Sequence, residues 1–373
     1  MIPHEALGQV TAIARQNAER VDIEGVFPAE AVEALRGSGL LGLVLPEEVG
    51  GLGCGPAEFT EVVGELASVC GSTAMVYLMH TVAAVTFADA PPPGMPDLLA
   101  GMAKGALLGT VAFSEKGSRS HFWAPVSSAS MNGGTVSVQA DKSWVTSAGF
   151  ADVYLVSMGS TSKTAGEVDL FAMAKGAAGM TVAGPWKGLG LRGNASSPMR
   201  IDSSIPVAHR LGDEGAGFEL MMNTGLPWFN LGNAAVSLGL SSAANAAAIS
   251  HVSSARLEHQ DEALSALPTI RAQIARMGIS LAAQRAFLAH AARSVSDPDE
   301  TTMLNVLAVK ASANDAALEI TDTAMRVCGG AAFSKHLPIE RAFRDARAGS
   351  VMAPTADVLY DFYGKAVSGL PLF

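Results

Sequence analysis

The chain has 373 residues, of which 49% are hydrophobic and 16% are charged. This is too apolar for a disordered chain, and the length is sufficient for more than one packed domain. The 25 basic and 35 acidic residues give a net charge of -10, and no block of Lys and Arg forms a basic stripe. This excludes nucleic acid as an expected partner, and the low charged fraction favours burial of surface in an oligomer.

Neither a metal site nor a membrane segment is expected. The three cysteines are odd in number, far apart and match no metal-ligand spacing: Cys54, Cys70 and Cys328. The most apolar stretch, 74–88, is interrupted by His80 and Thr81 and is shorter than the ~20 residues that a span requires. The first residues lack the apolar run of a signal peptide. These features predict a cytoplasmic protein with buried thiols.

Residues 1–104 have a helical pattern. The segments 28–35 and 56–67 each begin with proline and then place apolar residues at helical spacing. A glycine-rich connection at 45–53 lies between them, and the prolines of 90–94 break the pattern. We therefore expect an N-terminal α-helical domain, 1–104.

Residues 105–209 have the pattern of β-structure. Short apolar or alternating runs occur at 109–114, 135–140, 151–157 and 168–173, separated by turn residues. Several short strands at this spacing are typical of a barrel or a sandwich. We therefore expect a middle β domain, 105–209.

Residues 210–373 are helical again. Alanine-rich segments at 218–250, 267–294 and 301–328 have the lengths of antiparallel bundle helices. Gly329 and Gly330 are expected to end the third, and a last helix is expected to begin near Thr355. The fold class is thus α+β: an N-terminal helical domain, a middle β-barrel or sandwich, and a C-terminal four-helix bundle, 210–373.

Several segments resemble, in their order along the chain, motifs of the acyl-CoA dehydrogenase family, and the resemblance covers nearly the whole sequence. Each motif is weak alone, but their order and spacing are specific. They are Leu45-Pro-Glu-Glu-Val-Gly-Gly-Leu-Gly, Phe113-Ser-Glu, Lys142-Ser-Trp-Val-Thr-Ser-Ala-Gly, Gly188-Leu-Gly-Leu-Arg-Gly-Asn, Leu211-Gly-Asp-Glu-Gly-Ala-Gly-Phe, Val327-Cys-Gly-Gly-Ala-Ala-Phe and Pro338-Ile-Glu-Arg-Ala-Phe-Arg-Asp-Ala-Arg.

The resemblance implies an FAD site and a homodimer or homotetramer. Trp144 would pack near the isoalloxazine, and Thr146 would donate a hydrogen bond to the polar edge of the ring. Arg256 would meet the pyrophosphate of a neighbouring subunit's FAD. Taken singly, such residues more often belong to the core or to helix ends. The expectation of an FAD site therefore rests on all the motifs occurring together in the order of the family. The expected cofactor-binding residues are Phe113, Ser114, Ser120, Trp144, Thr146, Arg256, His259, Arg326, Gly329, Gly330 and Thr355.

The sequence departs from the family at both ends of this site. His259 stands where an aromatic residue is usual, and Arg326 stands where a glutamine is common. In the family a carboxylate removes the α-proton of an acyl thioester while a hydride leaves the β-carbon for the flavin. Ala353 occupies the usual position of that carboxylate, and Phe229 occupies the alternative one. Neither side chain accepts a proton.

Three explanations remain open. In the first, a different group is the base, and His121 and Asp357 are the nearest titratable candidates. Chemistry without such a base is the second, as in oxygen-dependent oxidation or hydroxylation by relatives of this fold. The third is a protein that binds a ligand without catalysis.

We interpret the chain as an FAD-dependent oxidoreductase that acts on an acyl thioester of CoA or of a carrier protein. The expected electron acceptor is an electron-transfer flavoprotein or oxygen. The residues expected to line the substrate pocket are Trp228, Phe229, Asn230, Met352 and Ala353.

Overall fold

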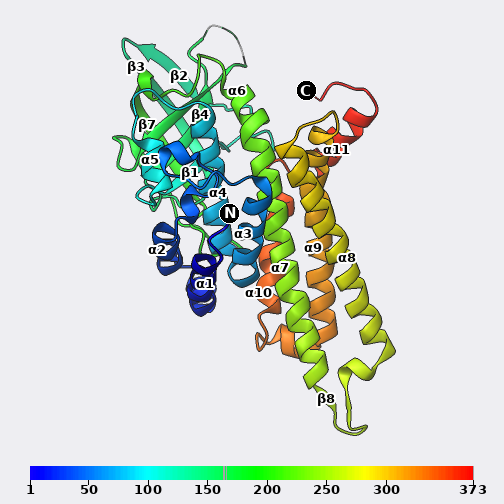
Figure 1. Ribbon diagram of the computed structural model, residues 1–373. Coiled ribbons are helices and arrows are strands. Elements are labelled where there is room, and N and C mark those ends of the chain that lie inside the picture. Colours follow the sequence, from blue (N-terminus) through cyan, green and yellow to red (C-terminus); the bar gives the residue numbers. More distant parts are fainter. Residues whose placement is uncertain (163, 165, 373) are drawn as a thin grey trace.

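The computed structural model describes residues 1–162, 164 and 166–372. The chain forms a helical N-terminal part, a middle part with two β-sheets and a long helical C-terminal part (Figure 1). The predicted α+β fold class is therefore confirmed. The three cysteines are buried free thiols.

The N-terminal part packs around one largely buried helix, α4. Its elements are α1 (His4–Glu24), α2 (Ala29–Gly37), η1 (Leu40–Gly42), η2 (Glu47–Val49), α3 (Pro56–Val69), α4 (Gly71–Asp89) and α5 (Leu98–Ala103). In the described part of the chain α4 alone is long and apolar enough to cross a membrane, but 89% of its apolar window is buried inside the structure. Its composition is that of a helix covered on all sides.

A buried histidine joins α4 to the middle part. His80 Nε2 lies 2.9 Å from Leu41 O, and Nδ1 accepts the Gly109 N–H at 2.9 Å. Because Nδ1 is the acceptor, the ring is neutral with its proton on Nε2. Burial lowers the pKa of His80 to about 4.

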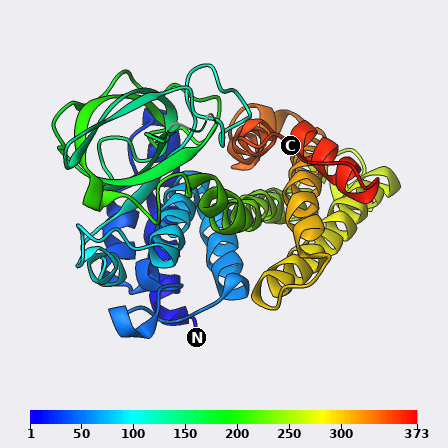
Figure 2. The ribbon, with the colours of Figure 1, turned by 90° about the horizontal axis from the view of Figure 1, so that it is seen from above.

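The middle part is a sandwich of two open sheets, seen to one side of the helices in Figure 2. One sheet has the order β1-β4-β5, with β1 parallel to β4, and the other is antiparallel with the order β2-β3-β7-β6. The strands are β1 (Gly109–Ala112), β2 (Ser128–Asn132), β3 (Thr135–Val145), β4 (Val153–Gly159), β5 (Val168–Ala174), β6 (Met180–Val182) and β7 (Ser197–Pro206), followed by η3 (Val207–His209).

Inward side chains of both sheets form one cluster that includes Val138, Val156, Phe171 and Ile201. The alternative of a closed barrel was wrong, because each sheet keeps free edges and the two meet face to face. Alternation alone does not distinguish these two arrangements.

The C-terminal part is a bundle in which α7 packs against α3, α9 and α10. Its elements are α6 (Gly217–Leu220), a π-helical turn (Met221–Gly225), α7 (Leu226–Ser254), β8 (Arg256–Leu257), β9 (Glu262–Ala263), η5 (Leu264–Ala266), α8 (Pro268–Ser296), α9 (Thr302–Phe333), α10 (Ile339–Val351) and α11 (Ala356–Val367). At Gly329 the φ/ψ of 53°/-131° breaks α9, a conformation open to glycine. The expected end of the third long helix is thus confirmed.

Candidate functional site

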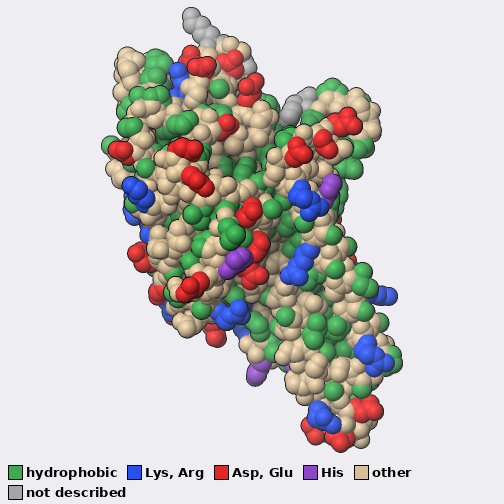
Figure 3. All heavy atoms as spheres, in the orientation of Figure 1, with side chains coloured by type: hydrophobic (Ala, Val, Ile, Leu, Met, Phe, Trp, Pro, Cys, Tyr) green, Lys and Arg blue, Asp and Glu red, His purple; other side chains and the backbone are tan. Residues whose placement is uncertain are grey.

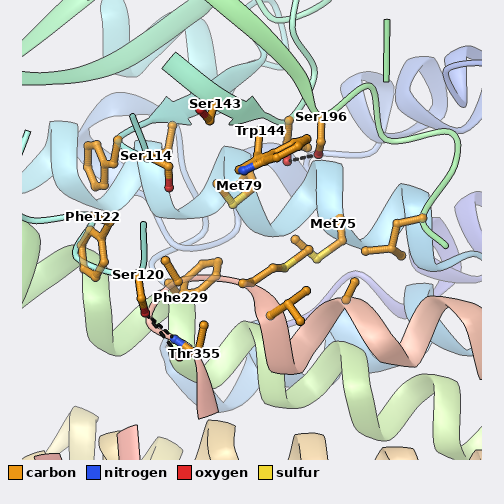
Figure 4. Close-up of a pocket in the computed structure, with 18 of the residues that line it drawn as sticks. Met75, Met79, Ser114, Ser120, Phe122, Ser143, Trp144, Ser196, Phe229 and Thr355 are labelled. Atoms are coloured by element: carbon orange, nitrogen blue, oxygen red, sulfur yellow. Dashed lines mark hydrogen bonds between the residues drawn. The ribbon is translucent and has the colours of Figure 1, made fainter. Parts of the chain in front are cut away.

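A pocket of about 700 Å³ lies between the middle part and three helices, α4, α7 and α10 (Figure 4). Strands β1 and β3 and the loop before β7 form one wall. The helices and the segment after α10 form the other. The pocket thus combines segments that are distant in the sequence, and its size suits a cofactor together with part of a substrate.

The β wall presents Trp144 to the pocket. A register shift between Lys142 and Val145 interrupts the alternation of β3, and Trp144 has a φ of 57°, uncommon for a bulky residue. The residue is 65% exposed, and its indole meets Trp186 edge to face, with ring centroids 5.8 Å apart. A large aromatic surface left open beside a pocket is suited to stacking against a flat ligand.

Hydroxyl groups lie beside this tryptophan. Thr146 Oγ1 and Ser196 Oγ are 3.0 Å apart, and both residues are buried. Next to them in the chain, Ser147 Oγ and Asn194 Nδ2 are buried without a hydrogen-bond partner among the described residues. Neither Ser147 nor Asn194 is among the residues that line the pocket, so the polar groups of this wall are the Thr146 and Ser196 hydroxyls.

A second polar group joins the loop after β1 to the start of α11. Ser120 Oγ accepts the Thr355 N–H at 3.0 Å, and both side chains line the pocket. Thr355 is the N-cap of α11, so the amides of that first turn begin at the pocket wall. Such amides and the helix dipole favour a negative ligand group.

The wall formed by the helices is apolar. It consists of Met75, Met79 and Val82 from α4, Leu226 and Phe229 from α7, and Ala348, Val351, Met352 and Ala353 from α10 and the segment after it. Arg119 and Lys187 are the charged residues that line the pocket, and no described lining residue is Asp, Glu or His. The described lining therefore contains no carboxylate or imidazole.

A buried ion pair anchors the loop that carries Ser120. Lys142 Nζ lies 2.6 Å from Glu115 Oε1, with both side chains almost fully buried. Glu115 Oε2 accepts the N–H groups of Val126 and Ser127, each at 2.7 Å. Burial lowers the pKa of Lys142, and the Glu115 carboxylate opposes that effect. Sequence reasoning missed this role, although two charged residues in strand-like runs were a signal.

Other lining residues were also missed. Apolar helix positions and loop residues have no signature that separates pocket from core. These residues are Met75, Met79, Arg119, Phe122, Trp186 and Lys187.

Most predicted residues at the flavin and substrate ends come together. The pocket is lined by Phe113, Ser114, Ser120, Trp144, Thr146, Phe229, Met352, Ala353 and Thr355. Trp228 and Asn230 lie elsewhere, and this corrects the expected pocket. Trp228 packs on Phe59 with centroids 5.3 Å apart, and Asn230 donates to Val306 O at 3.0 Å. Successive residues on a helix point about 100° apart, so the neighbours of Phe229 turn away.

The two titratable candidates lie outside the pocket lining. His121 is exposed and stacks on Trp123, with ring centroids 5.0 Å apart. Asp357 is exposed in the first turn of α11. Neither residue is among those that line the pocket.

The residues expected at the far end of the cofactor are not brought to the pocket within one chain. Arg256 pairs with Asp261 at 2.7 Å at the tip between α7 and α8, where acidic and basic side chains gather (Figure 3). Arg326 pairs with Asp322 on α9 at 3.8 Å. Neither these residues nor His259, Gly329 and Gly330 line the pocket. A role from a neighbouring subunit stays a prediction.

Known proteins are similar over the whole chain. Models of the acyl-CoA dehydrogenase N-terminal, middle and C-terminal domains match residues 8–90, 110–204 and 215–368. The short-chain specific acyl-CoA dehydrogenase of Clostridium acetobutylicum is 25% identical over 346 residues, 91% of this chain and 90% of that protein.

Two solved structures share the fold. Butyryl-CoA dehydrogenase from Megasphaera elsdenii superposes with a TM-score of 0.89 at 23% identity, covering 97% of this chain and 98% of that one. The prolyl acyl carrier protein oxidase AnaB has a TM-score of 0.89 at 18% identity, with 97% and 98% covered. Three matching domain models in the order of the family decide the assignment. The chain belongs to the acyl-CoA dehydrogenase family of flavin-dependent oxidoreductases.

Proposed function

We propose that the pocket binds FAD. The open indole of Trp144, the Thr146–Ser196 hydroxyl pair and the first turn of α11 supply the aromatic, neutral polar and anion-binding groups that this cofactor requires. When bound, the flavin would accept a hydride. The protein's residues orient the ring and exclude water from it.

The proposed substrate is an acyl thioester of CoA or of a carrier protein. The apolar helix wall suits an acyl chain, and Ala353 and Phe229 stand at the two positions from which a carboxylate would remove the α-proton. We propose that this site works without that carboxylate. The single observation that carries this proposal is the lack of Asp, Glu and His among the described lining residues. The proposed electron acceptor is an electron-transfer flavoprotein or oxygen.

Oxygen-dependent oxidation of a bound substrate is the second candidate function. A pocket with an apolar wall and no carboxylate excludes water well and offers no group for α-proton removal. Product that forms only when oxygen is present, with no flavin reduction by any acyl-CoA, would favour this candidate over dehydrogenation.

Titration of the purified protein with FAD tests the cofactor. The wild type is expected to bind at micromolar concentration, with quenched flavin fluorescence and a raised Tm. Trp144→Ala should weaken binding roughly three- to tenfold through loss of stacking. Met131→Ala removes an exposed side chain on β2 and serves as the matched control. No binding at tens of micromolar FAD would refute the proposal.

A further inference from the structure

A buried lysine lies directly behind the helix wall of the pocket. Lys310 is on α9 and is 0% exposed. Its Nζ donates to Met352 O at 3.0 Å and to Pro354 O at 2.6 Å. These carbonyls belong to the residues before and after Ala353, so the ammonium group is hydrogen-bonded on both sides of a residue that lines the pocket.

No acid compensates this charge among the described residues. Lys310 forms no described ion pair, and burial is the cause that lowers its pKa to about 7. Burying an ammonium group without a counter-ion is unfavourable unless its protons are hydrogen-bonded. Residues of the pocket segment accept two of its three ammonium protons. The free-energy cost of burying Lys310 therefore rises if that segment moves away.

The segment has few other restraints. It is the four-residue connection 352–355 between α10 and α11, without helix or strand. Met352 N donates to Ala348 O at 3.1 Å, and Thr355 N donates to Ser120 Oγ at 3.0 Å. In the described structure no further hydrogen bond reaches the carbonyl oxygens of Met352 and Pro354. Lys310 therefore supplies the hydrogen bonds to these two carbonyls, beside the contact of Asn233 Nδ2 with Met352 Sδ at 3.5 Å.

The same ammonium adjoins the second apolar position. Lys310 Nζ lies 5.8 Å from the ring centroid of Phe229, which lines the pocket from α7. The Lys310 side chain thus contacts the backbone around Ala353 and the ring of Phe229, the two positions where a carboxylate is missing. A charge at this distance from an aromatic face is attracted by it, which adds a restraint on the ring.

We propose that Lys310 is a positioning residue of the pocket. Its hydrogen bonds to the Met352 and Pro354 carbonyls place Ala353 and Thr355 against the ligand. Its contact with Phe229 restrains the orientation of that ring in the same wall. This inference rests on the proposed function for the identity of the ligand, but the positioning itself is a property of the chain without a ligand.

Hydrogen–deuterium exchange of the apoprotein tests the positioning directly. Lys310→Met keeps the length of the side chain and removes the donors. The exposed Lys175→Met is the control. Lys310→Met should speed amide exchange at residues 352–356 at least tenfold, while peptides of β3 and α8 stay unchanged. Lys310→Arg restores two donors and should recover part of the protection. If Lys310→Met does not fold, Lys310→Gln takes its place, with partial protection expected.

FAD binding then separates positioning from simple stability. Lys310→Met should weaken FAD binding roughly tenfold and shift the absorbance of the bound flavin, whereas Lys175→Met should do neither. Exchange and flavin spectrum equal to the wild type, with only a lower free energy of unfolding, would overturn the proposal. If the wild type binds no FAD, the proposed function fails, and the exchange data still decide the role of Lys310.

Discussion

Ala353 and Phe229 show how far single residues were predictable. Both were assigned to the pocket from alignment to family motifs, and both line it. Asn230 was assigned from the family position of an arginine and Trp228 as part of an apolar lining, and the helix carries both to other partners. The role of Lys310 could not be predicted, because only the folded chain brings near it the carbonyls that it contacts. The Glu115–Lys142 pair was missed, although two charged residues in strand-like runs indicated it.

The buried His80 predicts a pH dependence of stability. Its folded pKa of about 4 lies below the unfolded value of 6.5, so the unfolded chain binds more protons between these two values. The free energy of unfolding therefore carries no penalty from His80 above pH 6.5. It falls by about 3 kcal/mol as the pH drops from 6.5 toward 4. Asp345, whose pKa burial raises to about 6, has the opposite slope below pH 6.

Comparison with His80→Gln isolates the histidine, since the Asp345 slope is present in both proteins. Urea unfolding at pH 7, 5.5 and 4.5 should show the wild type losing about 2 kcal/mol more than the variant over this range. Parallel losses in the two proteins would contradict a buried neutral His80.

At the scale of elements, the long helices were predictable and the sheet edges were not. The segments 267–294 and 301–328 correspond closely to α8 and to the regular run of α9. The strands β2, β6 and β7 were not predicted. The first and second are short edge strands, whereas β7 alternates between buried and less buried residues, so its signal was present and was missed. The bulge that aims Trp144 into the pocket likewise has no sequence signal beyond its motif.

The Glu115–Lys142 pair predicts strong coupling between β3 and the loop after β1. Glu115→Gln leaves a buried ammonium unpaired, and Lys142→Met leaves a buried carboxylate unpaired. Each single change should lower the free energy of unfolding by about 3–5 kcal/mol, and the double variant should recover a large part. Urea unfolding of the four proteins measures the coupling, and simple additivity of the two losses would contradict it.

At the scale of the molecule, the long helices α7, α8 and α9 extend the chain, and β8, which begins at Arg256, lies at their lower end (Figure 1). Arg256 does not line the pocket of its own chain. We expect Arg256 to meet the flavin pyrophosphate of a neighbouring subunit, so light scattering should show a dimer or a tetramer. Co-expression of Trp144→Ala and Arg256→Ala chains sharpens the test. A mixed pair then holds one intact site if Arg256 acts across the interface, and none if it acts within its own chain. A monomer that binds FAD would contradict this assembly.

The most direct measurement of the central claim is anaerobic titration of the FAD-loaded protein with saturated acyl-CoAs, read as bleaching of the flavin. The wild type is expected to bleach slowly, because no described pocket residue removes the α-proton. Ala353→Glu should bleach about 10²-fold faster, because burial raises the pKa of a carboxylate there toward the working pH and makes it a base. Ala353→Gln has the same size without a base and should stay slow. Rapid bleaching of the wild type, or equal rates for the Glu and Gln variants, would contradict a site that lacks its carboxylate.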